Sequence, residues 1–203
     1  MTHYRFIGVA CVAVGVLLSV EAIGAQSVTA LIRRDIAAPS SHFTTYVEGE
    51  LVRVSIPSNW RELPASNGVT FAPEGAYGNA GVKSVFTHGL GMGLIRNDRG
   101  DLQMTTDDFI ESQVLDTSVP RRPHRYHNVT IADRPAIRTV LATVSEATNQ
   151  PEQIEVYTTL LRNGTVLYLL AVTSRDRASD YAETFRRVVG SIEIMDCESC
   201  VPK

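Results

Sequence analysis

The strongest constraint on the fold is a tight turn between two β-rich runs near the carboxy end of the chain. Arg162-Asn163-Gly164 separates residues 153–161 from residues 165–173, and Asn-Gly is the strongest short hairpin signal because both residues tolerate a positive φ. The second run is apolar on both faces as far as Val172. A strand of this kind is buried on both sides. We therefore expect a sheet with one layer above it and another below it.

Further strands are expected from runs that are rich in β-branched and aromatic side chains and bounded by turn residues. These runs are residues 42–47 and 51–56, which form one hairpin, residues 129–131 and 137–146, which form another, residues 69–72, and one long strand over 82–95. A hairpin places its two strands antiparallel. Most of the expected sheet is therefore antiparallel.

Two helices are expected to cover this sheet. Thr105 or Thr106 is a candidate cap for the first helix, which ends before Pro120. Asp180 is a candidate cap for the second. An apolar stripe with a period of 3.6 residues follows it, made of Tyr181, Phe185, Val188, Val189 and Ile192. The predicted fold class is α/β (α+β), a mainly antiparallel β-sheet covered by helices.

The amino end predicts export to the periplasm or the extracellular space. Residues 6–20 carry no charge and follow a short segment with one arginine, Arg5. This run is long enough for a signal sequence and shorter than the roughly 20 residues that span a bilayer. Small residues then lead to an expected cleavage site near Ala25. An uncleaved membrane anchor and a lipoprotein attached through Cys11 are the alternatives.

The rest of the chain is expected to form one domain. After a signal sequence over 1–25, residues 26–41 are a flexible lead, residues 42–194 are a domain long enough to bury its own core, and residues 195–203 are a tail. The formal net charge of the whole sequence is −3. This balance argues against a dedicated binder of nucleic acid or of anionic membranes, because such a protein carries a basic face.

The tail contains the two cysteines that signal cleavage would leave, Cys197 and Cys200. A structural zinc site needs four ligands, and the sequence has no second cysteine pair to complete one. In an exported chain a local disulfide between Cys197 and Cys200 is the simplest interpretation. Free thiols, an intermolecular disulfide and redox chemistry are the alternatives.

Two regions are candidates for contact with a partner. Gly89, Gly91 and Gly93 share one face of the expected long strand, which permits close packing of a helix or a shallow binding groove. The other region is a proline-bounded basic loop with two histidines: Arg121, Arg122, His124, Arg125 and His127. This loop either meets an acidic partner surface or is a solvated connector. Its histidines would need further ligands to hold a metal.

Several stretches resemble a known domain family. They are residues 51–60, 69–78, 86–89, 144–146, 155–162 and 185–188. Across residues 43–193 the chain resembles the PsbP-like (Mog-like) α/β/α domain, and most of all the version that lies carboxy-terminal to exported bacterial zinc metalloproteases. The resemblance implies a PsbP-like α/β/α sandwich, an exported setting and a role in protein binding or assembly.

The metalloprotease signature itself is absent from the sequence. His-Glu-x-x-His, in which two histidines hold zinc and the glutamate acts as a base, occurs nowhere, and neither does Gly-x-Ser-x-Gly nor Ser-x-x-Lys. The expected function is a non-catalytic binding or assembly module for another envelope protein, without metal or cofactor. An accessory factor of an envelope zinc metalloprotease and a hydrolase with an unrecognised site are the alternatives.

Overall fold

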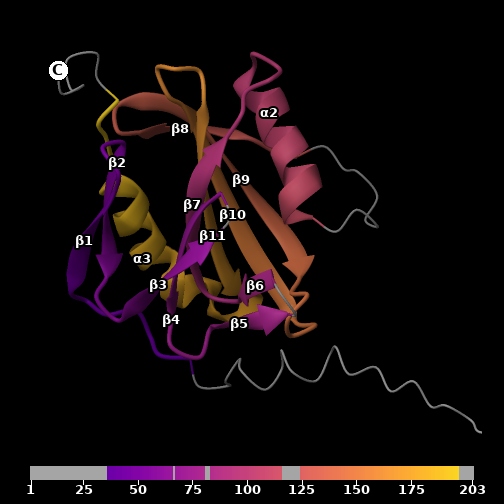
Figure 1. The fold of residues 1–203 in the computed structure, drawn as a ribbon. Coiled ribbons are helices and arrows are strands. Elements are labelled where there is room, and N and C mark those ends of the chain that lie inside the picture. Colours follow the sequence, from indigo (N-terminus) through magenta and orange to yellow (C-terminus); the bar gives the residue numbers. More distant parts are fainter. Residues whose placement is uncertain (1–35, 66, 81–82, 116–123, 197–203) are drawn as a thin grey trace, which may run out of the picture.

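The computed structural model describes residues 36–65, 67–80, 83–115 and 124–196. Within these ranges the chain forms three layers (Figure 1). A seven-stranded sheet lies in the middle, α2 (Leu102–Phe109) covers one face, and α3 (Ala178–Gly190) covers the other together with a three-stranded sheet. The expected fold class, a mainly antiparallel sheet covered by helices, is confirmed. The predicted signal sequence and the tail with Cys197 and Cys200 lie outside the described residues.

The seven-stranded sheet is antiparallel between all neighbours. Its strands run in the order β3 (Trp60–Ala65), β4 (Gly68–Pro73), β7 (Gly89–Ile95), β11 (Val166–Ser174), β10 (Pro151–Leu160), β9 (Arg134–Val144) and β8 (His127–Ile131). The two predicted hairpins β8–β9 and β10–β11 are confirmed, and Leu160 pairs with Val166 beside the Asn-Gly turn. β11 is central, so its alternate side chains fill the cores on both faces.

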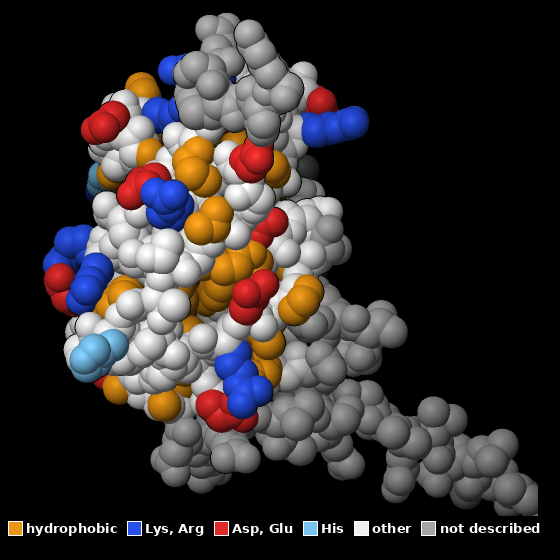
Figure 2. All heavy atoms as spheres, turned by 60° about the vertical axis from the view of Figure 1, so that its left-hand side comes forward, with side chains coloured by type: hydrophobic (Ala, Val, Ile, Leu, Met, Phe, Trp, Pro, Cys, Tyr) orange, Lys and Arg blue, Asp and Glu red, His pale blue; other side chains and the backbone are white. Residues whose placement is uncertain are grey.

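The three-stranded sheet contains the third predicted hairpin, β1 (Phe43–Glu48) with β2 (Val52–Pro57), and adds the short β12 (Glu193–Ile194). Val52, Val54 and Ile56 of β2 are buried in the same core as Tyr181 and Phe185 of α3. Figure 2 shows the face that carries β1 and β2, where hydrophobic side chains reach the surface between acidic and basic ones.

The prediction of a single long strand over residues 82–95 is wrong. The chain instead forms β6 (Lys83–Phe86), which pairs with β5 (Tyr77–Ala80) in a separate two-stranded sheet, and then bends before β7. Gly89 has φ +138°, a conformation that side chains with a Cβ rarely adopt, and a Cβ there would lie 2.1 Å from the Phe71 carbonyl oxygen. The glycine therefore permits both the bend and the close approach of β4.

Both expected helix caps are also wrong. Asp101, not a threonine, caps α2, because its Oδ1 accepts the Met104 N–H at 2.8 Å. α2 continues into a π-helical turn, η1 (Ile110–Val114). α3 begins at Ala178 after a 3-10 turn, η2 (Arg175–Arg177), so Asp180 lies in its first turn. No helix in the described part of the chain is long and apolar enough to cross a membrane.

Candidate functional site

A pocket of about 450 Å³ opens between α2 and the adjoining ends of β7 and β11. We call it the α2 pocket. Its floor is largely apolar and is formed by Ile95, Phe109, Tyr168 and Leu170. Its rim carries polar and charged side chains, among them Asn67, Arg96, Asp98, Arg99, Asp108 and Gln113. This volume is enough for a small molecule or for a side chain and adjacent backbone from a partner.

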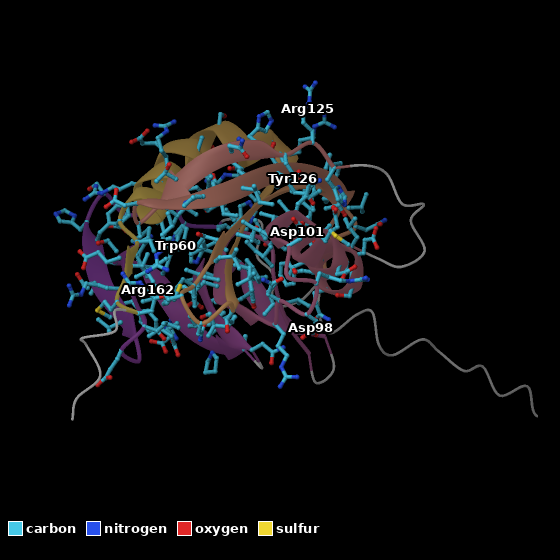
Figure 3. The ribbon with its side chains drawn as sticks, turned by 90° about the horizontal axis from the view of Figure 1, so that it is seen from above. Trp60, Asp98, Asp101, Arg125, Tyr126 and Arg162 are labelled. Carbon is cyan, nitrogen blue, oxygen red and sulfur yellow. The ribbon has the colours of Figure 1, made fainter. Side chains whose placement is uncertain are left out.

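Hydrogen bonds to the sheet and to the preceding loop fix α2 beside the pocket. The hydroxyl oxygens of Thr106 on α2 and Thr158 on β10 lie 2.7 Å apart in a buried contact. The Thr105 hydroxyl donates to Oδ1 of Asn97 at 2.7 Å, which holds the β7–α2 loop against the helix. In Figure 3, Asp98 of this loop lies toward the outer edge of the view and Asp101 lies at the start of α2, and both residues are exposed.

Tyr168 provides a polar group in the otherwise apolar floor. Its ring packs against Phe109 with the ring centroids 4.5 Å apart. Burial raises the pKa of Tyr168, so the hydroxyl stays protonated and can donate a hydrogen bond. The part of the chain that the structure describes gives this hydroxyl no hydrogen-bond partner. A ligand acceptor in the pocket could supply the missing partner.

Gly93 explains how the Tyr168 hydroxyl reaches this position. The two residues are directly paired between β7 and β11. A Cβ at Gly93 would lie 2.7 Å from the Tyr168 hydroxyl oxygen and 2.1 Å from the Asn67 carbonyl oxygen. Both distances are far below van der Waals contact. A residue without a side chain is therefore required where the floor and the rim of the pocket meet.

The rim carries two positive and two negative side chains. Arg99 Nε donates to Asp108 Oδ2 at 2.8 Å, and both side chains are about half exposed. Among the described residues Arg96 and Asp98 have no ion-pair partner. The formal charges of these four groups cancel, so the pocket lacks the strong field of one sign that highly charged ligands such as nucleic acids require.

The three glycines singled out in the sequence do not themselves line the α2 pocket. Gly91 and Gly93 lie on the α2 side of β7, opposite Leu170 and Tyr168, and these two partners line the pocket instead. A Cβ at Gly91 would lie 3.6 Å from Cζ of Phe86, an ordinary contact. Gly89 lies at the bend. The groove predicted at Gly89, Gly91 and Gly93 stays a prediction.

The basic loop is only partly described, because Arg121 and Arg122 lie outside the described residues. His124 is half-buried, Arg125 is exposed, and His127 is exposed as the first residue of β8. Figure 3 shows Arg125 pointing away from the molecule, while the Tyr126 hydroxyl donates to Asp107 Oδ1 on α2 at 2.5 Å. Contact between this loop and a partner stays a prediction. The described residues contain no group of three or more His, Cys, Asp or Glu side chains that could hold a metal.

His88 and Ser174 come nearest to a catalytic pair. His88 Nε2 lies 3.0 Å from Ser174 Oγ, but the imidazole is only 4% exposed and packs on the Tyr181 ring of α3. Burial lowers the pKa of His88 to about 4. A base this weak and this enclosed is poorly suited to remove a proton from a hydroxyl at neutral pH. The His88 ring packs on α3, on the opposite face of the sheet from the α2 pocket.

The comparisons with known proteins give a fold and no closer relationship. No known family profile matches the sequence, and no curated protein matches it. The cyanobacterial PsbP (CyanoP) of Synechocystis sp. PCC 6803 superposes with a TM-score of 0.52 at 14% identity, over 79% of this chain and 95% of that chain. The Ran-binding protein Mog1p of Saccharomyces cerevisiae superposes with a TM-score of 0.52 at 10% identity, over 77% and 97%. The chain has the PsbP-like (Mog-like) fold.

Proposed function

We propose that this chain is an exported, non-catalytic binding or assembly module that holds a segment of another envelope protein in the α2 pocket. The observation that carries the proposal is the pairing of an apolar floor with polar groups that have no partner within the described chain. Phe109 and Leu170 offer a surface for a hydrophobic side chain. The Tyr168 hydroxyl and the Arg96 guanidinium offer hydrogen-bond donors to the carbonyl groups beside it.

The charge balance of the rim supports a protein segment over a strongly charged ligand. A peptide segment has a neutral backbone and needs matched donors and acceptors, and a mixed rim of Arg96, Arg99, Asp98 and Asp108 provides both. The overall net charge of −3 agrees with this choice. Mog1p, which shares the fold, is named a Ran-binding protein, and the cyanobacterial PsbP shares the same fold. Their likeness supports the fold on which the proposal is built.

Site-specific photocrosslinking in the exporting cell tests the binding role. A photoreactive phenylalanine replaces Gln113 at the rim of the pocket, and a matched chain carries it at Val47, which is 46% exposed on β1. We expect a discrete crosslinked partner from position 113 and none from position 47. Ala65→Trp, an exposed position beside the pocket, should fill it and remove the product. Identical products from both positions, or none from position 113, would refute the pocket as the binding site.

The export and non-catalytic parts of the proposal have their own tests. Export rests on residues 1–25, and the mass of the exported chain should be lower by about 25 residues. The non-catalytic part is supported by the lack of any protease signature in the sequence. Purified protein should hydrolyse neither casein nor peptide libraries, with or without added zinc. Chelator-sensitive cleavage that His124→Ala abolishes would instead make the basic loop an active site.

A further inference from the structure

The second half of β9 has an open backbone edge. β8 pairs with β9 only from Arg134 to Arg138, whereas β10 pairs with β9 as far as Val144. In Figure 1, β8 lies near the top of the molecule and β9 continues downward past it. Residues 140–144 therefore have a strand on one side and, in the described part of the chain, none on the other, whereas the Thr139 hydroxyl still donates to the Arg125 carbonyl beside it. The outward-facing N–H and C=O groups of such an edge are available to another strand.

The side chains on this edge are uncharged and partly hydrophobic. Val140 is 42% exposed and Val144 is 54% exposed, and both lie on the same face as the exposed Ala142. The opposite edge of the sheet, β3, differs because Arg61, Glu62 and Pro64 interrupt it. Charged residues and proline protect edge strands against pairing with other chains. The open edge of β9 lacks that protection.

The sequence of the open edge is nearly symmetric about Ala142. Residues 140–144 read Val-Leu-Ala-Thr-Val. If two copies pair antiparallel with the two-fold axis at Ala142, Val140 faces the partner's Val144 and Ala142 faces the partner's Ala142. Like charges directly opposite one another destabilise an antiparallel pair, and residues 139–145 contain none. A self-complementary patch of this kind is what a two-fold interface requires.

We propose that two copies of this chain associate through β9, with residues 140–144 paired antiparallel about Ala142. The two seven-stranded sheets become one continuous sheet across the interface. Val140 and Val144 of each copy form a small apolar contact on the face where both are exposed. No residue of this edge lines the α2 pocket, so the proposal is independent of the binding role proposed above.

Cysteine cross-linking tests the register directly. In a Cys197→Ser, Cys200→Ser chain expressed with its own leader, Ala142→Cys places one thiol opposite its own copy. Cα atoms directly opposite in an antiparallel pair lie about 4.5–5.5 Å apart, within the reach of a disulfide. We expect a disulfide-linked dimer on mild oxidation. Val144→Cys is the matched control, since its own copy lies four residues away, about 13 Å along the strand, and should stay unlinked.

Two further measurements complete the test. A mixture of the Val140→Cys chain and the Val144→Cys chain should cross-link, because this register places those residues opposite one another. Sedimentation of the chain without substitutions in β9 should show a concentration-dependent dimer, and Ala142→Lys should raise its dissociation constant by at least about tenfold by placing two ammonium groups at the axis. A monomer at all concentrations, or equal cross-linking of Ala142→Cys and Val144→Cys, would overturn the proposal.

Discussion

The Nε2 atom of His88 lies 3.0 Å from the Ser174 hydroxyl oxygen, a contact that joins the bend before β7 to the end of β11. The other ring nitrogen lies 3.1 Å from the Thr87 hydroxyl. Burial lowers the pKa of His88 to about 4, and the nearby Arg177 charge is the second cause of this shift. The folded protein therefore holds His88 neutral, whereas the unfolded chain protonates it near its ordinary pKa of about 6.5.

Stability should consequently fall when the pH drops through the interval between these two pKa values. Between about pH 6.5 and about pH 4 the unfolded chain binds the proton and the folded chain does not, so acid favours unfolding. The contribution of His88 is fully present above that interval. Between about pH 7.5 and about pH 5 its loss should lower the free energy of unfolding by about 2 kcal/mol. Urea unfolding followed by the fluorescence of Trp60, the one tryptophan of the sequence, measures this change.

His88→Gln is the control for that measurement. Glutamine keeps a polar contact with Ser174 available but does not titrate, and every other ionisable group is unchanged. The variant should lose less stability than the native chain over the same pH interval, by about 2 kcal/mol. Parallel pH profiles for the two proteins would show that His88 is not the titrating group.

The hydroxyl contact between α2 and β10 predicts an asymmetric pair of substitutions. Thr106→Val leaves the fully buried Thr158 hydroxyl without its partner, which should cost about 1–3 kcal/mol. Thr158→Val should cost less, because the Thr106 hydroxyl also donates to the Leu102 carbonyl at 2.7 Å. The double variant should recover part of the loss. Urea unfolding of all four proteins gives the coupling energy, and strictly additive effects would argue against the contact.

Gly93 and Gly91 form a matched pair on one strand. Gly93→Ala should lower the free energy of unfolding by about 1–3 kcal/mol, since its Cβ would overlap the Asn67 carbonyl oxygen. Gly91→Ala should lie within about 0.5 kcal/mol of the native chain or above it, because its Cβ meets only ordinary contacts. Denaturant titration of both variants measures the two changes in the free energy of unfolding. Equal effects would mean that β4 and its turn can move away from β7.

Local signals predicted the three hairpins, the strand β4 and the presence of both helices, but they missed β3 and β12, the break in the long strand expected over 82–95, and the helix caps. The Asn163-Gly164 turn and the alternation beside it depend on neighbouring residues only, so β10 and β11 could be found from the sequence. β3 could not, because Arg61, Glu62 and Pro64 make it look like a loop, and pairing with β4 is what holds it as a strand. The short β12 likewise forms only because β2 is beside it.

The α2 pocket could not be predicted from local sequence signals, for a related reason. Asn67, Ile95 and Tyr168 lie far apart in the chain and meet only through the pairing of β4, β7 and β11. The spaced glycines of β7 were a usable signal for close packing on that strand. They could not show which residue would occupy the space, since the register between β7 and β11 is not encoded in either strand alone.

The apolar stripe of α3 gives a direct test of the core. Phe185 is 2% exposed and packs against Trp60 and Tyr181, with ring centroids 6.3 Å and 5.6 Å away. Phe185→Ala should cost about 3–5 kcal/mol, through lost burial and the cavity left behind. Ala182→Ser, an exposed position on the same helix, should change stability by less than about 0.5 kcal/mol. If Phe185→Ala left the free energy of unfolding unchanged, the apolar stripe of α3 would not be an important part of the core.

The contacts of Asp196, and not the cysteines that follow it, should hold the end of the domain in place. The Asp196 carboxylate accepts hydrogen bonds from the Arg134 guanidinium and, at 2.8 Å, from the Arg162 N–H. Burial alone would raise its pKa, but these partners hold the pKa of Asp196 below its ordinary value. Asp196→Ala removes the partner of Arg134, which is 20% exposed, and should cost about 1–3 kcal/mol.

Cys197→Ser with Cys200→Ser should in contrast leave the melting temperature nearly unchanged. A disulfide between them would close a very short loop and so constrain the unfolded chain little, and the contacts of Asp196 already attach the end of the domain ahead of both residues. Thermal unfolding of the two variants beside the native chain makes the comparison. Two outcomes would place the attachment at the cysteines instead of at Asp196: a large drop in the melting temperature of the double serine variant, or an unchanged melting temperature for Asp196→Ala.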